Sequence, residues 1–288
     1  MTRAADYLDL VRAPASLTVL GDALVGGLSA RGPGGDGAVR AGVLAVSSVC
    51  LYSAGMALND WADADLDAVE RPERPIPSGR ISRSRALAAG AGLTLVGVGS
   101  AFVAGPRSGA VSLALAGALW AYDLVFKSTV AGPVVMAACR GLDVMMGAAG
   151  PGWRRALLPA GAVAAHTVAV TAVSRGEVDG STRTIGRAAV GAGVAVAASG
   201  LAGPGDRAAA ALGGARYLAA VLPGHLAVAR DPDAATARAA TRAGIRAVVP
   251  LQVALAARAG STIATLALLG VEAIGLALGR RRSRGDIT

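Results

Sequence analysis

The sequence of 288 residues is poor in the residue types on which several protein classes depend. Aromatic residues make up 3% of it and charged residues 16%, and it contains two cysteines, two histidines and a single lysine. Cys50 and Cys139 fall in apolar segments, which excludes a disulfide scaffold. His166 and His225 are isolated and give no metal-ligand spacing. Without aromatic or motif support, the net charge of +9 does not indicate nucleic-acid binding.

Apolar and small residues dominate instead. Hydrophobic residues make up 53% of the chain, glycines number 40, and the mean hydropathy is +0.53. Segments such as Leu87–Gly105 carry no charge, whereas a soluble amphipathic helix would carry charge on one face. A bilayer core takes roughly 20 apolar residues per helix. We therefore expect one polytopic, all-α transmembrane domain over 1–288, with spans near 16–30, 38–58, 84–104, 108–126, 130–150, 156–173, 187–203, 208–229, 242–259 and 261–279, and a short surface helix before the first.

The basic residues predict an orientation for these spans. With a cytoplasmic amino terminus and ten spans, nineteen of the 28 basic residues fall on the cytoplasmic side and eight on the other. This is the positive-inside bias, and attraction to anionic lipid headgroups accounts for the basic pI of about 10.8. We expect a protein of the cytoplasmic (inner) membrane with both termini in the cytoplasm.

The most informative stretch is Asn59–Arg80, directly after the second apolar segment. Asp60, Asp63 and Asp67 are spaced three and four residues apart, so on one helix they share a face. Neighbouring carboxylates favour a cation between them, and Mg²⁺ commonly bridges carboxylates to substrate phosphates. The following arginines are suited to holding phosphate oxygens; they are Arg71, Arg74 and Arg80. The spacing predicts a diphosphate site at the membrane surface that faces the cytoplasm.

A second polar loop, Ser174–Arg183, is expected on the same face. Glu177 is a candidate ligand for a second Mg²⁺ and Asp179 a weaker one. Arg175 and Arg183 are candidates for phosphate oxygens, and an ordinary hydrophilic turn is the alternative. Within the fifth span, Arg140 and Asp143 are one turn apart at a depth where charge is costly. One expectation is that the two residues form an i,i+3 ion pair with each other. The other is that Arg140 binds diphosphate or an acidic acceptor, and that Asp143 orients Arg140 or stabilises a carbocation.

The motif Asn59-Asp60-x-x-Asp63-x-x-x-Asp67 resembles the first aspartate motif of the UbiA superfamily of intramembrane prenyltransferases. The likeness continues through Arg71–Gly79, and is also seen in Arg12-x-Pro14 and in Tyr122 with Lys127. It implies a bundle of typically nine helices around a central cavity, and Mg²⁺-assisted ionisation of an isoprenyl diphosphate. Asn59, Asp60, Asp63 and Asp67 would hold the metal. Lys127 would contact diphosphate or else be an interfacial lysine, and Tyr122 would be a cavity wall or an interface aromatic.

The second family motif, usually two or three aspartates at four-residue spacing, reads Ser174-Arg175-Gly176-Glu177-Val178-Asp179 here. Together with Cys139–Asp143, this stretch is similar to the UbiA-like branch of Ebo-type clusters. We expect an Mg²⁺-dependent prenyltransferase with membrane lipids as surroundings and an unidentified acceptor. A UbiA-type terpene cyclase acting on the diphosphate itself and a non-catalytic isoprenoid-binding protein are the alternatives.

Overall fold

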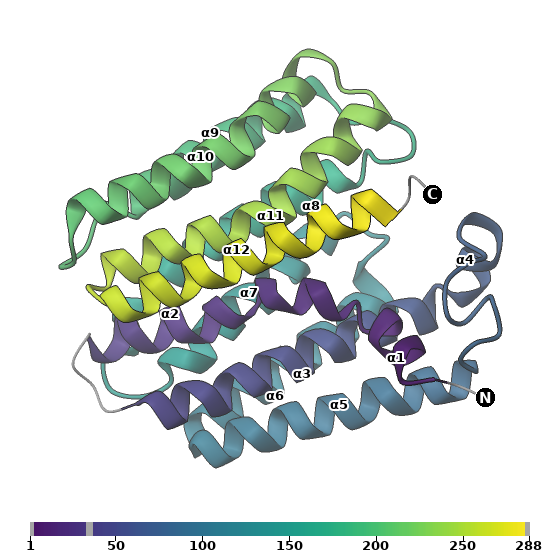
Figure 1. Ribbon diagram of the computed structural model, residues 1–288, viewed down its shortest axis with the longest axis horizontal. Helices are drawn as coiled ribbons and strands as arrows, with labels where there is room; N and C mark the ends of the chain where they lie inside the picture. The colour runs from purple at the N-terminus through teal and green to yellow at the C-terminus, as the bar shows by residue number, and fades with distance from the viewer. Residues whose placement is uncertain (1–2, 33–36, 286–288) are drawn as a thin grey trace.

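A computed structural model describes residues 3–32 and 37–285 of the chain, with side chains up to Ala277. The described residues form helices and connecting turns, with no strand among them. Figure 1 shows an elongated bundle in which the axes of the long helices are roughly parallel to one another. Their bounds are α1 (Ala4–Leu10), α2 (Leu20–Arg31), α3 (Ala38–Ala62), α4 (Ala64–Glu70), α5 (Arg83–Ala104), α6 (Pro106–Ala121), α7 (Gly132–Ala148), α8 (Leu157–Ser174), α9 (Arg183–Ser199), α10 (Arg207–Arg230), α11 (Ala234–Arg258) and α12 (Thr262–Gly285).

Each expected span overlaps one of these helices, and α1 lies where a short helix was expected before the first span. Five stretches of the described chain are long and apolar enough to cross a bilayer: Ala13–Arg31, Ala38–Ala62, Arg83–Ala104, Pro106–Phe126 and Trp153–Ser174. Helices α9 and α11 begin earlier than expected, at Arg183 and Ala234. Their N-caps, Thr182 and Asp233, accept hydrogen bonds from backbone N–H groups of the first turn. The added stretches carry Arg183 in α9 and Arg238 in α11, charged residues that an apolar window leaves out.

The first expected span is interrupted. Ala13–Thr18 forms a 3₁₀ helix, and α2 starts only after Val19. Arg12, just before the 3₁₀ helix, has φ 48°, and Pro14 follows in its first turn. The Thr18 carbonyl at the break accepts hydrogen bonds from Arg140 Nη2 at 3.0 Å and from Gln252 Nε2 at 2.8 Å. Side chains of α7 and α11 thus satisfy a carbonyl beside the break, as irregular backbone inside a membrane protein requires.

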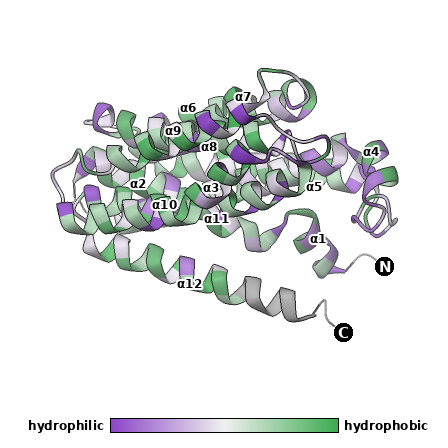
Figure 2. Ribbon diagram, turned by 90° about the horizontal axis from the view of Figure 1, so that it is seen from above, coloured by the Kyte–Doolittle hydropathy of each residue, from purple (hydrophilic) through white to green (hydrophobic). Residues whose placement is uncertain are grey.

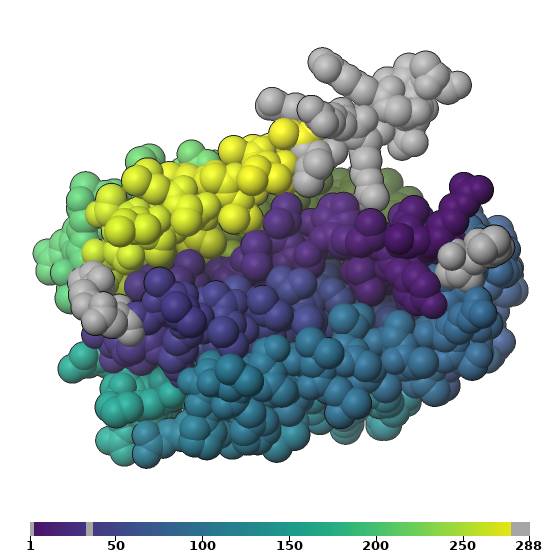
Figure 3. Space-filling view, turned by 60° about the horizontal axis from the view of Figure 1, so that its bottom comes forward, coloured from purple at the N-terminus to yellow at the C-terminus, as the bar shows by residue number. Residues whose placement is uncertain are grey.

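Two large apolar clusters meet at α2 and α7. One contains residues of α8 to α12 and the other residues of α3, α5 and α6, while α2 and α7 contribute to both. The backbones of α2 and α7 touch at two glycines: a Cβ at Gly26 would overlap the Val144 carbonyl, and one at Gly147 the Ala23 carbonyl. Such small residues allow helices to approach closely in a membrane. Figure 3 shows the segment from α1 to α2 between α12 and α3.

The loops next to the carboxyl end of α3 gather at one end of the bundle. Arg175, after α8, donates to the Thr129 carbonyl in the α6–α7 loop. The Ser181 backbone N–H donates to the Pro232 carbonyl at 2.7 Å and so joins the α8–α9 and α10–α11 loops. Figure 2 shows hydrophilic residues concentrated around α1 and α4 at this end. The two polar loops identified in the sequence therefore lie at the same end, which we call the polar end.

At the opposite end Arg40 holds three helices together. Its guanidinium donates to the carbonyls of Ala104, Gly147 and Ala149, and to Ser108 Oγ at 2.6 Å. These four acceptors lie at the end of α5, near the start of α6, and at the end of α7 and just after it. Arg40 therefore acts as a shared C-terminal cap for α5 and α7, because it satisfies carbonyls that have no partner within their own helices.

Candidate active site

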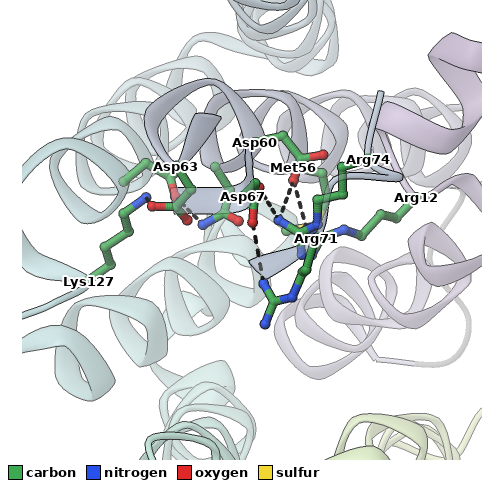
Figure 4. A network of polar contacts seen from close by, with 10 residues as sticks. Arg12, Met56, Asp60, Asp63, Asp67, Arg71, Arg74 and Lys127 are labelled. Carbon is green, nitrogen blue, oxygen red and sulfur yellow. Dashed lines mark hydrogen bonds and ion pairs between the residues drawn. The ribbon is translucent and has the colours of Figure 1, made fainter. Parts of the chain in front are cut away.

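The aspartates of the first motif surround the junction between α3 and α4. Asp60 lies in the last turn of α3, Asp63 is at the junction, and Asp67 lies in α4. Backbone hydrogen bonds from Asp63 to Asn59 and from Asp67 to Asp63 continue the helical pattern across this junction. Asp60 and Asp67 are 3% and 1% exposed. Within this arrangement Asp60 and Asp67 reach one common partner and Asp63 reaches another (Figure 4).

Arg74 is that common partner. Its Nη1 lies 3.3 Å from Asp60 Oδ1 and 2.5 Å from Asp67 Oδ2, so one guanidinium bridges both carboxylates. Arg12 Nη2 approaches Asp60 Oδ1 at 2.8 Å, and Arg71 Nη1 lies 3.6 Å from Asp67 Oδ1. Arg12 Nη1 also donates to Met56 Sδ at 3.5 Å. Buried carboxylates require such compensation, because an unpaired buried charge is costly.

The α6–α7 side of the site supplies the remaining groups. Lys127 Nζ lies 2.6 Å from Asp63 Oδ1, and Asn59 Nδ2 donates to Asp123 Oδ1 at 3.3 Å. Asp123 belongs to a single π-helical turn, Tyr122–Phe126, that ends α6. Tyr122 begins this turn and is half-buried. The acidic motif is therefore flanked by cations on both sides: Arg12, Arg71 and Arg74 on one, Lys127 on the other.

A small apolar cluster holds the arginine-bearing loop in place. Ile81 is 1% exposed and packs with Leu10 of α1, Ala57 of α3 and Ala86 of α5. Ser82 caps α5 by accepting from the Arg85 backbone N–H, and Gly79 takes a positive φ of 73° in the turn before it. The loop from α4 to α5 is thus anchored behind Arg74, which fixes where that side chain can reach.

Arg80 does not join the other arginines. Its Nη1 binds Asp6 at 3.2 Å and Asp9 at 3.0 Å, and its Nη2 donates to the Glu73 carbonyl. In this arrangement Arg80 ties α1 to the loop, and its expected role as a phosphate ligand remains a prediction. The Arg3 backbone N–H and the Arg80 guanidinium hold the pKa of Asp6 below its usual value, and hydrogen bonds to Asp9 and Asp6 raise the pKa of Arg80.

The donor set fits a hard divalent cation in its chemistry. Among the described residues, no three His, Cys, Asp or Glu side chains converge at metal-binding distance. Asp60 and Asp67 nevertheless direct oxygens at one point, where the Arg74 guanidinium now lies. Asp67 Oδ1 is a buried oxygen that receives no hydrogen bond in the described structure. Carboxylate and amide oxygens of this kind suit Mg²⁺.

The second polar loop contributes mainly backbone to this end of the molecule. Arg175 donates to the Thr129 and Ser128 carbonyls, beside Lys127 in sequence, and Arg238 donates to the Glu177 carbonyl. Asp179 and Arg183 are exposed. The roles expected for Arg175, Glu177, Asp179 and Arg183 as phosphate or metal ligands remain predictions.

Arg140 and Asp143 do not pair with each other. Arg140 Nε lies 2.9 Å from Asp22 Oδ2 of α2, and Asp143 Oδ1 accepts from Ser48 Oγ of α3 at 2.5 Å. Gln252 of α11 donates to Asp22 Oδ1 at 2.7 Å. The expected i,i+3 pair is wrong because each residue has a closer partner on another helix. Arg140 thus contacts the break before α2, and the roles expected for Arg140 as a diphosphate or acceptor ligand and for Asp143 beside it remain predictions.

Two acidic residues of these networks were missed from the sequence. Asp22 and Asp123 are each a lone acid inside an apolar segment, 0% and 4% exposed. A lone ionisable residue in a membrane span is itself a signal for an interior role. Arg12, noted only as a family feature, proves to be a direct partner of Asp60.

Comparisons with known proteins indicate the family of this chain. A model of the UbiA prenyltransferase family matches residues 19–187. A digeranylgeranylglyceryl phosphate synthase from Methanopyrus kandleri is 39% identical over 145 residues, which is 50% of this chain and 52% of that protein. The chain spans about half or less of the length of the curated relatives it matches.

Solved structures of UbiA homologues share the fold. A UbiA homologue from Aeropyrum pernix K1 superposes with a TM-score of 0.65 at 20% identity, over 81% of this chain and 94% of that one. A UbiA homologue from Archaeoglobus fulgidus, bound to GPP and Mg²⁺, superposes with a TM-score of 0.54 at 16% identity, over 92% and 99%. At these identities the likeness is one of fold.

Proposed function

This chain belongs to the UbiA prenyltransferase family, and on that premise we propose that it transfers an isoprenyl group from a diphosphate donor to an acceptor, with Mg²⁺ as cofactor. It is an integral membrane protein, as its long apolar helices and its family indicate. One observation supports the proposal above the others: three aspartates and four cations meet at the polar end of an apolar helical bundle.

The cationic residues are suited to the donor diphosphate. Arg12, Arg71, Arg74 and Lys127 already lie beside the carboxylates, so they would contact diphosphate oxygens with little rearrangement. As the bond from carbon C1 to the diphosphate oxygen breaks, the electron pair leaves with pyrophosphate, and these four cations stabilise the growing negative charge. Guanidinium groups match phosphate oxygens in geometry as well as in charge.

Asp60, Asp63, Asp67 and Asn59 would hold Mg²⁺, which when bound neutralises diphosphate charge and so favours departure of pyrophosphate. The apolar helices beside the site would keep water from the allylic cation. An acceptor nucleophile then bonds to C1 and loses a proton to a nearby base or water. Since digeranylgeranylglyceryl phosphate synthases are among the similar curated proteins, we propose a prenylated glycerol phosphate as the first acceptor to test. We also propose that the polar end faces the cytoplasm.

Pyrophosphate release by the purified protein in detergent tests the proposal. The protein is given Mg²⁺ and geranyl, farnesyl or geranylgeranyl diphosphate, with and without geranylgeranylglyceryl phosphate, and the organic layer is analysed by mass spectrometry. We expect release that depends on acceptor and Mg²⁺ and that Asp60→Ala or Asp63→Ala abolishes. Release of a cyclic hydrocarbon or alcohol without acceptor would identify a cyclase instead. No release with any donor or acceptor would contradict the transferase.

A further inference from the structure

Asp123 is the buried acid of the site that has no place in the aspartate motif. It is 4% exposed and lies on the π-helical turn between α6 and the loop that carries Lys127. The Lys127 backbone N–H donates to the Tyr122 carbonyl at 2.9 Å across this turn. π-Helical turns are rare and are found at functional sites more often than elsewhere. The turn places a carboxylate and an ammonium four residues apart against the end of α3.

These two groups meet two residues at the end of α3 that are also four apart: Asn59 in its last turn and Asp63, its C-cap. Asp123 accepts from Asn59 Nδ2 at 3.3 Å, while Lys127 contacts Asp63 at 2.6 Å. The π turn and the last turn of α3 are therefore joined by two polar contacts side by side. The lysine contact pairs opposite charges. The other pairs a carboxylate with a neutral amide, so charge neutralisation does not explain it.

The chemistry of the amide explains it better. An ionised carboxylate only accepts hydrogen bonds, and a side-chain amide carries a donor nitrogen and an acceptor oxygen that can exchange places by rotation. Beside Asp123, the rotation that turns Asn59 Oδ1 to the carboxylate would set two acceptors against each other. Asp123 thus keeps Nδ2 of Asn59 on its own side and leaves Oδ1 for another partner. A hard cation requires that oxygen and not the nitrogen.

We propose that Asp123 is a positioning residue that orients the Asn59 amide, so that Asn59 Oδ1 is presented as a ligand for a divalent cation at the aspartate site. This inference rests on the proposed function, because it concerns the same site. Groups that orient ligands in this way typically change metal affinity by about 10- to 100-fold when altered.

Cation binding can be measured apart from turnover. The probe is Mn²⁺, followed by electron paramagnetic resonance, in the presence of an unreactive farnesyl thiolodiphosphate. We expect Asp123→Asn to weaken Mn²⁺ binding about tenfold, because a neutral amide at 123 tolerates either orientation of Asn59. Asn59→Ala should weaken it similarly. The double variant should bind no more weakly than Asn59→Ala, since Asp123 acts through Asn59.

A swapped pair provides the rescue. In Asn59→Asp with Asp123→Asn, the amide at 123 donates to the carboxylate at 59, and an oxygen stays available to the cation. Its Mn²⁺ affinity should return to within about threefold of the wild type. Glu272→Gln, which removes a carboxylate that pairs with Arg216 on other helices, is the matched control and should leave binding unchanged. Thermal unfolding midpoints close to the wild type would show that the variants are folded.

The outcomes separate this inference from the proposed function. If the wild type binds no Mn²⁺ with the analogue, both fail. If it binds and Asp123→Asn binds equally well, Asp123 does not position a ligand although the site is real. Additive losses in the double variant would also overturn the positioning role, because Asp123 would then act independently of Asn59.

Discussion

At the polar end, each aspartate of the first motif forms an ion pair with an arginine or lysine. Asp60 and Asp67 share Arg74, Asp63 has Lys127, and Arg12 and Arg71 complete the neutralisation. Arg74 occupies the point between two carboxylates where a divalent cation would bind. In the proposed enzyme, the divalent cation would pair with the aspartates and the diphosphate with the arginines and Lys127. Either ligand alone would leave the partners of the other as unpaired buried charges, so the two would bind together.

Arg74 should accordingly matter more than any exposed arginine nearby. We expect Arg74→Gln to reduce pyrophosphate release by about 100-fold, because one donor to a developing anion contributes on that order. Arg83→Gln is the control: Arg83 pairs with the exposed Asp65, and its loss should change the rate by less than about twofold. Equal effects of the two substitutions on steady-state rates would show that Arg74 has no special role.

Spacing along the chain predicted the residues that are local to one helix end, and failed where partners come from far away. Asp60, Asp63 and Asp67 were identified because they lie within eight residues, and Arg71 and Arg74 follow at once. Lys127 and Arg12 entered only through the family resemblance. Asp123 was missed because a single acid shows no periodicity, and its contact with Asn59 depends on how α6 packs on α3.

Helix irregularities bring the polar groups to their places. The break before α2 frees the Thr18 carbonyl, Asp63 lies at the α3–α4 junction, and the π turn carries Asp123. Hydropathy predicted where ten helices lie but none of these irregularities, because a window of apolar residues does not register the hydrogen bonds within it. The regular helices thus build the bundle, and the interrupted segments position the polar residues of the site.

The crossing of α2 and α7 should be the part of the frame least tolerant of added volume. We expect Gly26→Ala to destabilise the protein by about 1–3 kcal/mol, because its Cβ would overlap the Val144 carbonyl and backbone cannot move as a side chain can. Gly42→Ala in α3 is the matched control, since a Cβ there meets nothing within 4 Å. Thermal unfolding in detergent measures the difference; equal midpoints for the two variants would contradict the close crossing.

The whole molecule has two chemically different ends. Loops that carry the first motif, Lys127 and the second polar loop meet at the polar end, and Arg40 closes the other. The charge bias in the sequence predicted which loops share a side. Which compartment each end of the bundle faces remains a prediction. The two termini of the chain, residues 1–2 and 286–288, lie outside the described residues.

Single cysteines in a background without Cys50 and Cys139 test the two-ended arrangement. Ser78→Cys and Val178→Cys, both exposed at the polar end, should react with a membrane-impermeant maleimide only after the cytoplasmic side is opened. Trp153→Cys, at the other end, should react in intact cells. Reaction of Ser78→Cys and Val178→Cys from opposite sides of the membrane would contradict the fold. If all three cysteines reacted from the side opposite to the one expected, only the predicted orientation would be wrong.

The pairing of Lys127 with Asp63 has a practical consequence, because no other residue of the chain carries a side-chain amine. An amine-reactive acylating reagent can modify only this side chain and a free amino terminus, so the unaltered protein already contains a single-site reporter. Its side chain is 20% exposed, which leaves it accessible but slow to react. Peptide mass spectrometry should find acylation at Lys127 slowed when an isoprenyl diphosphate is bound and unaffected by the corresponding alcohol. Equal protection by both would place the bound ligand's headgroup elsewhere.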